Sequence, residues 1–352
     1  MRIEQIVLNA ERNVTLTAYL LDVGGEFGNI PRRPAVLVLP GGGYAMCSER
    51  EADPVALAYL EAGFQAFVLR YSVGEGVVWP MPLEDYEQAM ELLRARAEEW
   101  SLYPDKIAVA GFSAGGHLAA SAAAIAKNKP NAAILGYAVT EGAIVKACLP
   151  TAPDLVDKVD GDTCPCFVFA TRTDNVVPVS NSLHFVQALE EHGVMFESHI
   201  YAYGPHGFSV GSPAVLAPDA KIAPRAARWV EDSIAWLKEL FGDFGGGALT
   251  APRFGRRVDG DNEPFLSVDC TMGRLMAVPQ AREILAPIMA AAQEKMAEKY
   301  GDAMTSLGKS SDAGMGMKMT LRSALAYGST PQDVVERLNA ALRQIPNPQD
   351  DK

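Results

Sequence analysis

Short apolar runs that stop at glycine or polar residues recur through the first 240 residues, and they constrain the fold of this chain more than any other feature. Residues 34–40 (PAVLVLP), 64–70 (FQAFVLR) and 106–111 (KIAVAG) are continuous apolar runs, typical of strands buried on both faces. Further strands are predicted at 132–139, 166–171 and 196–203.

Helical segments lie between these runs. Residues 53–61 predict a helix that stops at Gly63, and residues 83–100 carry acids early and bases later, as the helix dipole favours. Other helices are predicted at 114–126, near 180–192 and at about 224–241. This β-α-β alternation predicts an α/β fold with a doubly wound, mostly parallel sheet. Such sheets bind ligands at the carboxyl ends of their strands.

Composition divides the chain into parts. Residues 140–163 are rich in Pro, Asp and Thr and predict an excursion over the site. The whole net charge of −12 lies before residue 246, and the remainder carries equal numbers of both signs. We therefore predict a catalytic domain over residues 1–243, a Gly- and Pro-containing linker over 244–264 and a small helical C-terminal domain over 265–352.

The C-terminal pattern is helical. One predicted apolar helix face comprises Ile284, Leu285, Ile288, Met289, Ala292 and Met296. A Gly/Met-rich loop at 308–317 precedes a short helix near 320–327. The last helix is expected to begin with Thr330 as N-cap and Pro331 in the first position. Its apolar face comprises Val334, Val335, Leu338 and Leu342.

Charge and cysteine usage narrow the classes of protein. A pI near 5.0 argues against nucleic acid or an anionic membrane as partner. The chain has no apolar run of about 18 residues, so no transmembrane helix is expected, and its first residues do not resemble a signal peptide. The five cysteines are few, odd in number and scattered, which predicts reduced thiols and a cytoplasmic location.

The motif Gly111-Phe112-Ser113-Ala114-Gly115 directly follows the predicted strand 106–111 and opens a predicted helix. A nucleophilic serine needs this context, because a sharp strand-to-helix turn exposes its hydroxyl above the sheet. The alternative is a Gly-rich turn that contains a serine by chance.

A serine hydroxyl also needs a base and an orienting acid, which this architecture supplies in the order acid, then histidine. Asp174 follows the strand 166–171, and His206 lies on a Gly/Pro-flanked loop after the strand 196–203. Asp154 and Asp157 compete for the role of the acid. The other histidines, His117, His184, His192 and His199, are interpreted as structural.

Backbone N–H groups that face the developing oxyanion are the remaining requirement. The N–H of Ala114 is one candidate, and Gly42 and Gly43 in the loop Pro40-Gly41-Gly42-Gly43-Tyr44 are the others. A phosphate-binding loop is the alternative, but the three adjacent glycines lack the spacing of either common phosphate motif.

These motifs, with Asp174-Asn175-Val176-Val177-Pro178 and Gly204-Pro205-His206-Gly207-Phe208, resemble those of α/β-hydrolase esterases of the acetyl xylan esterase or xylanase-associated type. The resemblance covers about residues 10–241. Pro40 stands where many relatives have histidine. The resemblance implies a serine esterase that removes acetyl groups from acetylated oligosaccharides such as xylo-oligosaccharides. Such an enzyme acts on a small-molecule ester without metal or cofactor.

Several questions stay open at this level. A short-chain carboxylesterase, formamidase or peptidase could use the same residues, and a non-catalytic binding protein could keep the fold. Candidate substrate-binding residues are Tyr44, Trp79, Met81 and Phe208, each of which is equally compatible with a core position. The C-terminal domain loosely resembles helical modules appended to bacterial glycosidases. Its Met-rich composition also suits a homo-oligomer contact.

Overall fold

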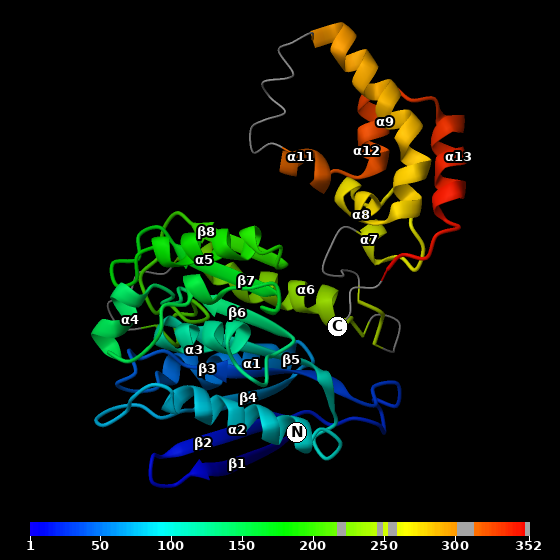
Figure 1. Ribbon diagram of the computed structural model, residues 1–352. Coiled ribbons are helices and arrows are strands. Elements are labelled where there is room, and N and C mark those ends of the chain that lie inside the picture. Colours follow the sequence, from blue (N-terminus) through cyan, green and yellow to red (C-terminus); the bar gives the residue numbers. More distant parts are fainter. Residues whose placement is uncertain (217–222, 245–248, 253–258, 301–312, 349–352) are drawn as a thin grey trace. The chain divides into compact units, whose positions relative to one another are not determined.

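The computed structural model describes residues 1–216, 223–244, 249–252, 259–300 and 313–348 (Figure 1). The chain divides into two compact units, Met1–Arg253 and Phe254–Lys352. The division falls inside the stretch expected to be a linker.

The first unit is built on one eight-stranded sheet with the order β1-β2-β4-β3-β5-β6-β7-β8. β1 and β2 are antiparallel additions at one edge, and from β4 onward all neighbouring strands are parallel. Figure 1 shows β1 and β2 at one edge and β8 at the other. The strands are β1 (Arg2–Asn9), β2 (Val14–Leu20), β3 (Arg33–Leu39), β4 (Gln65–Arg70), β5 (Leu102–Phe112), β6 (Ala132–Gly136), β7 (Cys166–Thr171) and β8 (Phe196–Tyr201).

Helices cover both faces of this sheet. They are α1 (Asp53–Glu61), α2 (Met81–Ala95), α3 (Ser113–Ala124), α4 (Gly142–Cys148), α5 (Ser180–Glu191) and α6 (Trp229–Phe241). One hydrophobic cluster joins α2, α3 and α5 to one face, and a second joins α1 and α6 to the other. Alternate residues of β3 enter different clusters: Leu37 faces the first, and Val36 and Val38 face the second. Burial on both faces explains why these strands are continuously apolar.

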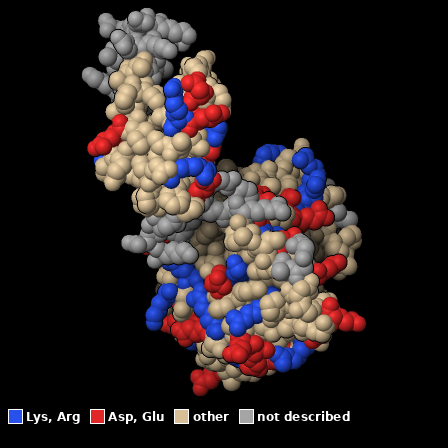
Figure 2. Space-filling view, turned by 90° about the vertical axis from the view of Figure 1, so that its right-hand side faces the viewer, with Lys and Arg blue, Asp and Glu red and all other residues tan. Residues whose placement is uncertain are grey.

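The predicted strands and helices are present with shifted ends. The helix predicted over 83–100 ends at Ala95, where turns lead directly into β5. The segment 140–163, which was predicted as an excursion, contains α4 and a 3₁₀ turn at Val156–Lys158. All five cysteines are unpaired. Figure 2 shows basic and acidic side chains interspersed over the visible face of the first unit.

The second unit is a small helical assembly. It contains α7 (Asp259–Asn262), α8 (Met272–Ala277), α9 (Pro279–Tyr300), α11 (Ala313–Lys318), α12 (Leu321–Tyr327) and α13 (Gln332–Leu342). Its own core includes Leu275, Leu285 and Leu342, with Ile284, Ile288 and Met289 packed against it. The side chains of Ala292 and Met296 lie outside the described residues.

Two details of this unit correct the sequence-based expectations. The last part of the predicted loop 308–317 is helical in α11, whereas its residues before 313 are outside the described part. The N-cap of α13 is Pro331 rather than Thr330, because α13 begins one residue later than predicted. Among the helices that the structure describes, none combines the length and apolar character needed to cross a membrane.

Candidate active site

Ser113 stands at the sharp turn between β5 and α3 with a φ of 53°, a left-handed conformation that is unusual for a residue other than glycine. The turn depends on close packing. A Cβ on Gly111 would overlap the carbonyl of Gly115, and a Cβ on Gly115 would overlap the carbonyl oxygens of Leu39 and Pro40. The glycines of the motif therefore let α3 start against the ends of β3 and β5, with Ser113 at the carboxyl edge of the sheet.

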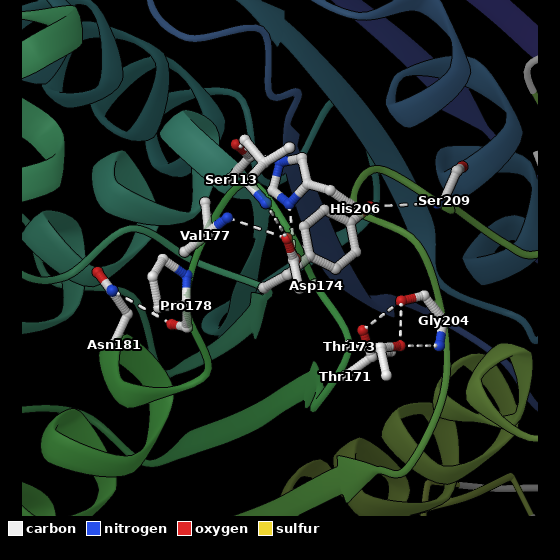
Figure 3. A network of polar contacts seen from close by, with 12 residues as sticks. Ser113, Thr171, Thr173, Asp174, Val177, Pro178, Asn181, Gly204, His206 and Ser209 are labelled. Atoms are coloured by element: carbon white, nitrogen blue, oxygen red, sulfur yellow. Dashed lines mark hydrogen bonds and ion pairs between the residues drawn. The ribbon is translucent and has the colours of Figure 1, made fainter.

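Ser113, His206 and Asp174 form one hydrogen-bonded chain (Figure 3). His206 Nε2 lies 2.9 Å from Ser113 Oγ, and His206 Nδ1 lies 2.7 Å from Asp174 Oδ2. Because an ionised carboxylate only accepts, Nδ1 carries the proton and Nε2 is free to accept from the serine hydroxyl. The Asp174 side chain is 1% exposed, and its Oδ1 accepts from the N–H groups of Val176 and Val177.

Hydrogen bonds connect the loops after β7 and β8 below Ser113, His206 and Asp174 in the view of Figure 3. Thr171 Oγ1 and Thr173 Oγ1 donate to the carbonyl of Gly204, and the Gly204 N–H donates back to Thr173 Oγ1. The competing acid Asp154 instead accepts from the N–H groups of Gly142 and Val156. The structure thus brings Asp174, and not Asp154, to the histidine.

The glycine loop after β3 lies against the turn at Ser113. Gly42 and Gly43 have φ values of 132° and 62°, which side chains rarely adopt. The Gly41 N–H donates a hydrogen bond to Glu51 Oε2, with 2.9 Å between the nitrogen and the oxygen. The N–H groups of Gly42, Gly43 and Ala114 therefore remain the candidates for binding an oxyanion.

Tyr44 and Phe208 are 3% and 2% exposed, so the structure favours a packing position for these two predicted substrate residues. The Tyr44 hydroxyl is 2.8 Å from His117 Nδ1, and His117 Nε2 is 3.0 Å from the Pro153 carbonyl. Burial lowers the pKa of His117 to about 4, so this imidazole is neutral, with Nε2 as donor and Nδ1 as acceptor. The neutral ring joins α3 to the glycine loop and to the segment after α4.

Trp79 and Met81 are half-buried. The Trp79 ring packs edge-on against His117 with 5.4 Å between ring centroids, and its backbone N–H donates to Thr151 Oγ1. In the described part of the chain, no group of three or more His, Cys, Asp or Glu side chains is arranged to hold a metal ion.

Two buried residues beside the site were missed by sequence reasoning. Glu51 accepts from the Gly41 N–H and from the Tyr137 hydroxyl, which lies 2.7 Å from Glu51 Oε1. Neither residue belongs to a recognisable motif. Tyr137 is 86 positions from Glu51, and the two meet because β3, which precedes Glu51, and β6, which precedes Tyr137, both pair with β5.

Comparison with known proteins shows that this chain is similar to esterases. The BD-FAE family model matches residues 27–134. Endo-1,4-beta-xylanase B of Butyrivibrio fibrisolvens is 32% identical over 211 residues, which cover 51% of this chain and 33% of that protein. An acetylxylan esterase of Xylanibacter ruminicola is 29% identical over 208 residues, covering 52% and 43%. The chain therefore spans between a third and a half of the length of these curated relatives.

Solved structures match the fold over nearly their whole length. MGS-M1, an α/β-hydrolase enzyme from a Medee basin deep-sea metagenome library, is 43% identical, with a TM-score of 0.64, covering 68% of this chain and 97% of that one. The acetyl ester-xyloside bifunctional hydrolase of Caldicellulosiruptor lactoaceticus is 30% identical, with a TM-score of 0.57, covering 64% and 88%. The chain therefore belongs to the α/β-hydrolase family and is similar, within it, to acetyl xylan esterases and related esterases.

Proposed function

We propose that this protein is a serine esterase that removes acetyl groups from acetylated oligosaccharides, xylo-oligosaccharides foremost, through an acyl-enzyme. The observation that carries the proposal is the hydrogen-bonded chain from Ser113 through His206 to Asp174 at the carboxyl edge of the sheet. Similarity to an acetylxylan esterase and to an acetyl ester-xyloside hydrolase supports an acetyl group on a sugar.

In the proposed mechanism His206 Nε2 accepts the Ser113 proton while Ser113 Oγ attacks the ester carbonyl. Asp174 keeps the proton on Nδ1 and stabilises the imidazolium. The imidazolium then donates its new proton to the departing alcohol, which leaves an acetyl-Ser113. Water, deprotonated by His206, releases acetate and restores the serine.

The tetrahedral intermediates carry a negative oxygen that the N–H groups of Gly42, Gly43 and Ala114 would stabilise. Loss of one such donor typically lowers turnover by about 10²- to 10³-fold. The half-buried Trp79 and Met81 are proposed to contact the acyl or sugar portion, since both stay partly accessible.

Covalent labelling with a fluorophosphonate probe tests the nucleophile. We expect labelling of the wild type at Ser113 and none in Ser113→Ala. Failure of the wild type to be labelled would contradict the proposed function.

The substrate is tested separately, by mass spectrometry of acetylated xylo-, manno- and cello-oligosaccharides after incubation. Loss of acetyl groups from xylo-oligosaccharides is expected. A protein that is labelled but cleaves only simple short-chain esters would instead be a carboxylesterase, and one that cleaves amides a formamidase or peptidase.

A further inference from the structure

Glu51 is a buried carboxyl group directly behind the site, at the end of the short 3₁₀ turn Glu49–Glu51, and it is 3% exposed. Burial raises the pKa of Glu51. The hydrogen bonds from Tyr137 and Gly41, the charge that His206 carries when it is protonated and the charge of Arg50 oppose that rise. A carboxyl group in such a place requires an explanation, because burying a charge is costly unless its partners compensate.

The partners of Glu51 suit a carboxylate. Oε2 accepts from the Gly41 N–H, and Oε1 accepts from the Tyr137 hydroxyl. The Tyr137 oxygen itself accepts from the Ser209 N–H at 3.1 Å, so its single proton is directed at Glu51. Both carboxyl oxygens are therefore acceptors, which is the arrangement of the ionised form.

Through these contacts Glu51 joins the two loops on either side of Ser113. Gly41 opens the glycine loop, and a Cβ placed there would lie 2.5 Å from Glu51 Oε2 and 3.1 Å from Ser113 Cβ. On the other side, a Cβ on Gly207 would lie 3.7 Å from Glu51 Oε1. The carboxylate thus lies a few ångströms from both the nucleophile turn and the histidine loop.

The charged and titratable groups around His206 are few among the described residues. Asp174 bonds its Nδ1, the Tyr137 ring lies edge-on at 5.1 Å between centroids, and Glu51 lies beyond Tyr137. Arg50 faces Glu51 from the same turn, and its carbonyl accepts from the Ser209 hydroxyl. Glu51 is the second carboxylate, after Asp174, whose charge acts on His206 from the protein interior.

We propose that Glu51 is a positioning residue for acyl transfer. It holds the glycine loop through Gly41 and the histidine loop through Tyr137, and its charge favours the imidazolium that forms when His206 takes the Ser113 proton. This inference rests on the proposed esterase function. It assigns to Glu51 no contact with the substrate.

The test is Glu51→Gln, which keeps the size of the side chain but removes the charge and one acceptor. With 4-nitrophenyl acetate we expect kcat to fall about 10- to 100-fold, a fraction of the effect of losing an oxyanion donor outright, with KM nearly unchanged. The midpoint of the acid limb of the kcat/KM profile should move to lower pH, because removal of the Glu51 charge disfavours a positive charge on the neighbouring imidazole.

Glu49→Gln is the matched control. Glu49 lies in the same turn but is exposed and pairs with Arg70, so its variant should retain wild-type kcat and pH profile. If Glu51→Gln does not fold, Tyr137→Phe replaces it, since loss of the hydroxyl removes one of the two donors. For Tyr137→Phe we expect a fall in kcat of about 10-fold at unchanged KM.

Two results would overturn the proposal. One is an unchanged kcat and acid limb in Glu51→Gln, or an unchanged kcat in Tyr137→Phe if that variant is used. The other is a loss of activity that only follows the fraction of folded protein, with an unmoved acid limb, as a merely structural side chain would give. A wild type without esterase activity would instead contradict the proposed function, so the two failures are distinguishable.

Discussion

His117 is neutral inside the first unit, and this single residue makes stability depend on pH. Its pKa is lowered from 6.5 to about 4 by burial, whereas in the unfolded chain it returns to its ordinary value. The unfolded state therefore binds a proton that the folded state rejects between these values. Stability is fully present above about pH 6.5 and falls as the pH drops toward about 4.

We predict that this residue accounts for about 3 kcal/mol of the unfolding free energy lost between pH 7 and pH 4, at 1.36 kcal/mol for each unit of the shift. Urea denaturation of the wild type and of His117→Gln at both pH values measures the difference. His117→Gln should be less stable at pH 7 but lose less on acidification. Parallel pH dependence in the two proteins would contradict the prediction.

At the scale of elements, the start of α3 depends on a close approach to the ends of β3 and β5. A Cβ on Gly115 would overlap the carbonyl oxygens of Leu39 and Pro40, which are backbone atoms and cannot move aside singly. We predict that Gly115→Ala lowers the unfolding free energy by about 1–3 kcal/mol, the usual effect of overpacking, and lowers kcat as the turn at Ser113 shifts. Urea denaturation and ester hydrolysis measure the two effects.

Gly161→Ala is the control for this variant, since Gly161 lies in a turn and a Cβ there would meet nothing within 4 Å. The control should leave the unfolding free energy within about 0.5 kcal/mol of the wild type. If Gly115→Ala changed the unfolding free energy as little as Gly161→Ala, the prediction that a Cβ at Gly115 overlaps the Leu39 and Pro40 carbonyl oxygens would be wrong.

Continuous apolar runs could be predicted as strands from the sequence, and so could the edge strand β8. The antiparallel strands β1 and β2 could not, although β2 is almost wholly buried. β3, β4 and β7 are continuously apolar because helices cover both sides of the sheet. β1, which the sequence analysis did not identify, lies at the edge and leaves Ile3 and Val7 more than half exposed, so its pattern is mixed. Ser113, Asp174 and His206 follow strand ends and lie together, because parallel strands bring their carboxyl ends to one edge of the sheet.

The contact between Glu51 and Tyr137 could not be predicted from the sequence. Their contact joins a turn before α1 to the end of β6, and no spacing rule connects the two. The burial of Tyr44 was equally hidden, because its hydroxyl finds a partner, His117, only when the glycine loop lies against α3.

At the scale of the whole molecule, the site and the C-terminal helices belong to separate units. Ser113, Asp174, His206 and Glu51 all lie in Met1–Arg253, and each hydrophobic cluster lies wholly within one unit. The metagenome hydrolase is covered over 97% of its length while about a third of this chain stays unmatched. A hydrolase unit of this kind therefore exists without a counterpart of the second unit.

We predict that a chain ending at residue 252 folds and hydrolyses 4-nitrophenyl acetate with a kcat/KM within about threefold of the full chain, since domains with their own core fold independently. Calorimetry of the full chain should show a transition for each unit, and the shortened chain should keep one of them at an unchanged Tm. A shortened chain that folds but loses activity more than about tenfold would mean that the second unit completes the site, because Ser113, His206 and Asp174 are all present in the shortened chain. Gel filtration of both chains would then separate the two roles open to that unit. A smaller oligomer after truncation would indicate a contact between copies, and an unchanged oligomeric state would indicate a direct effect on the substrate.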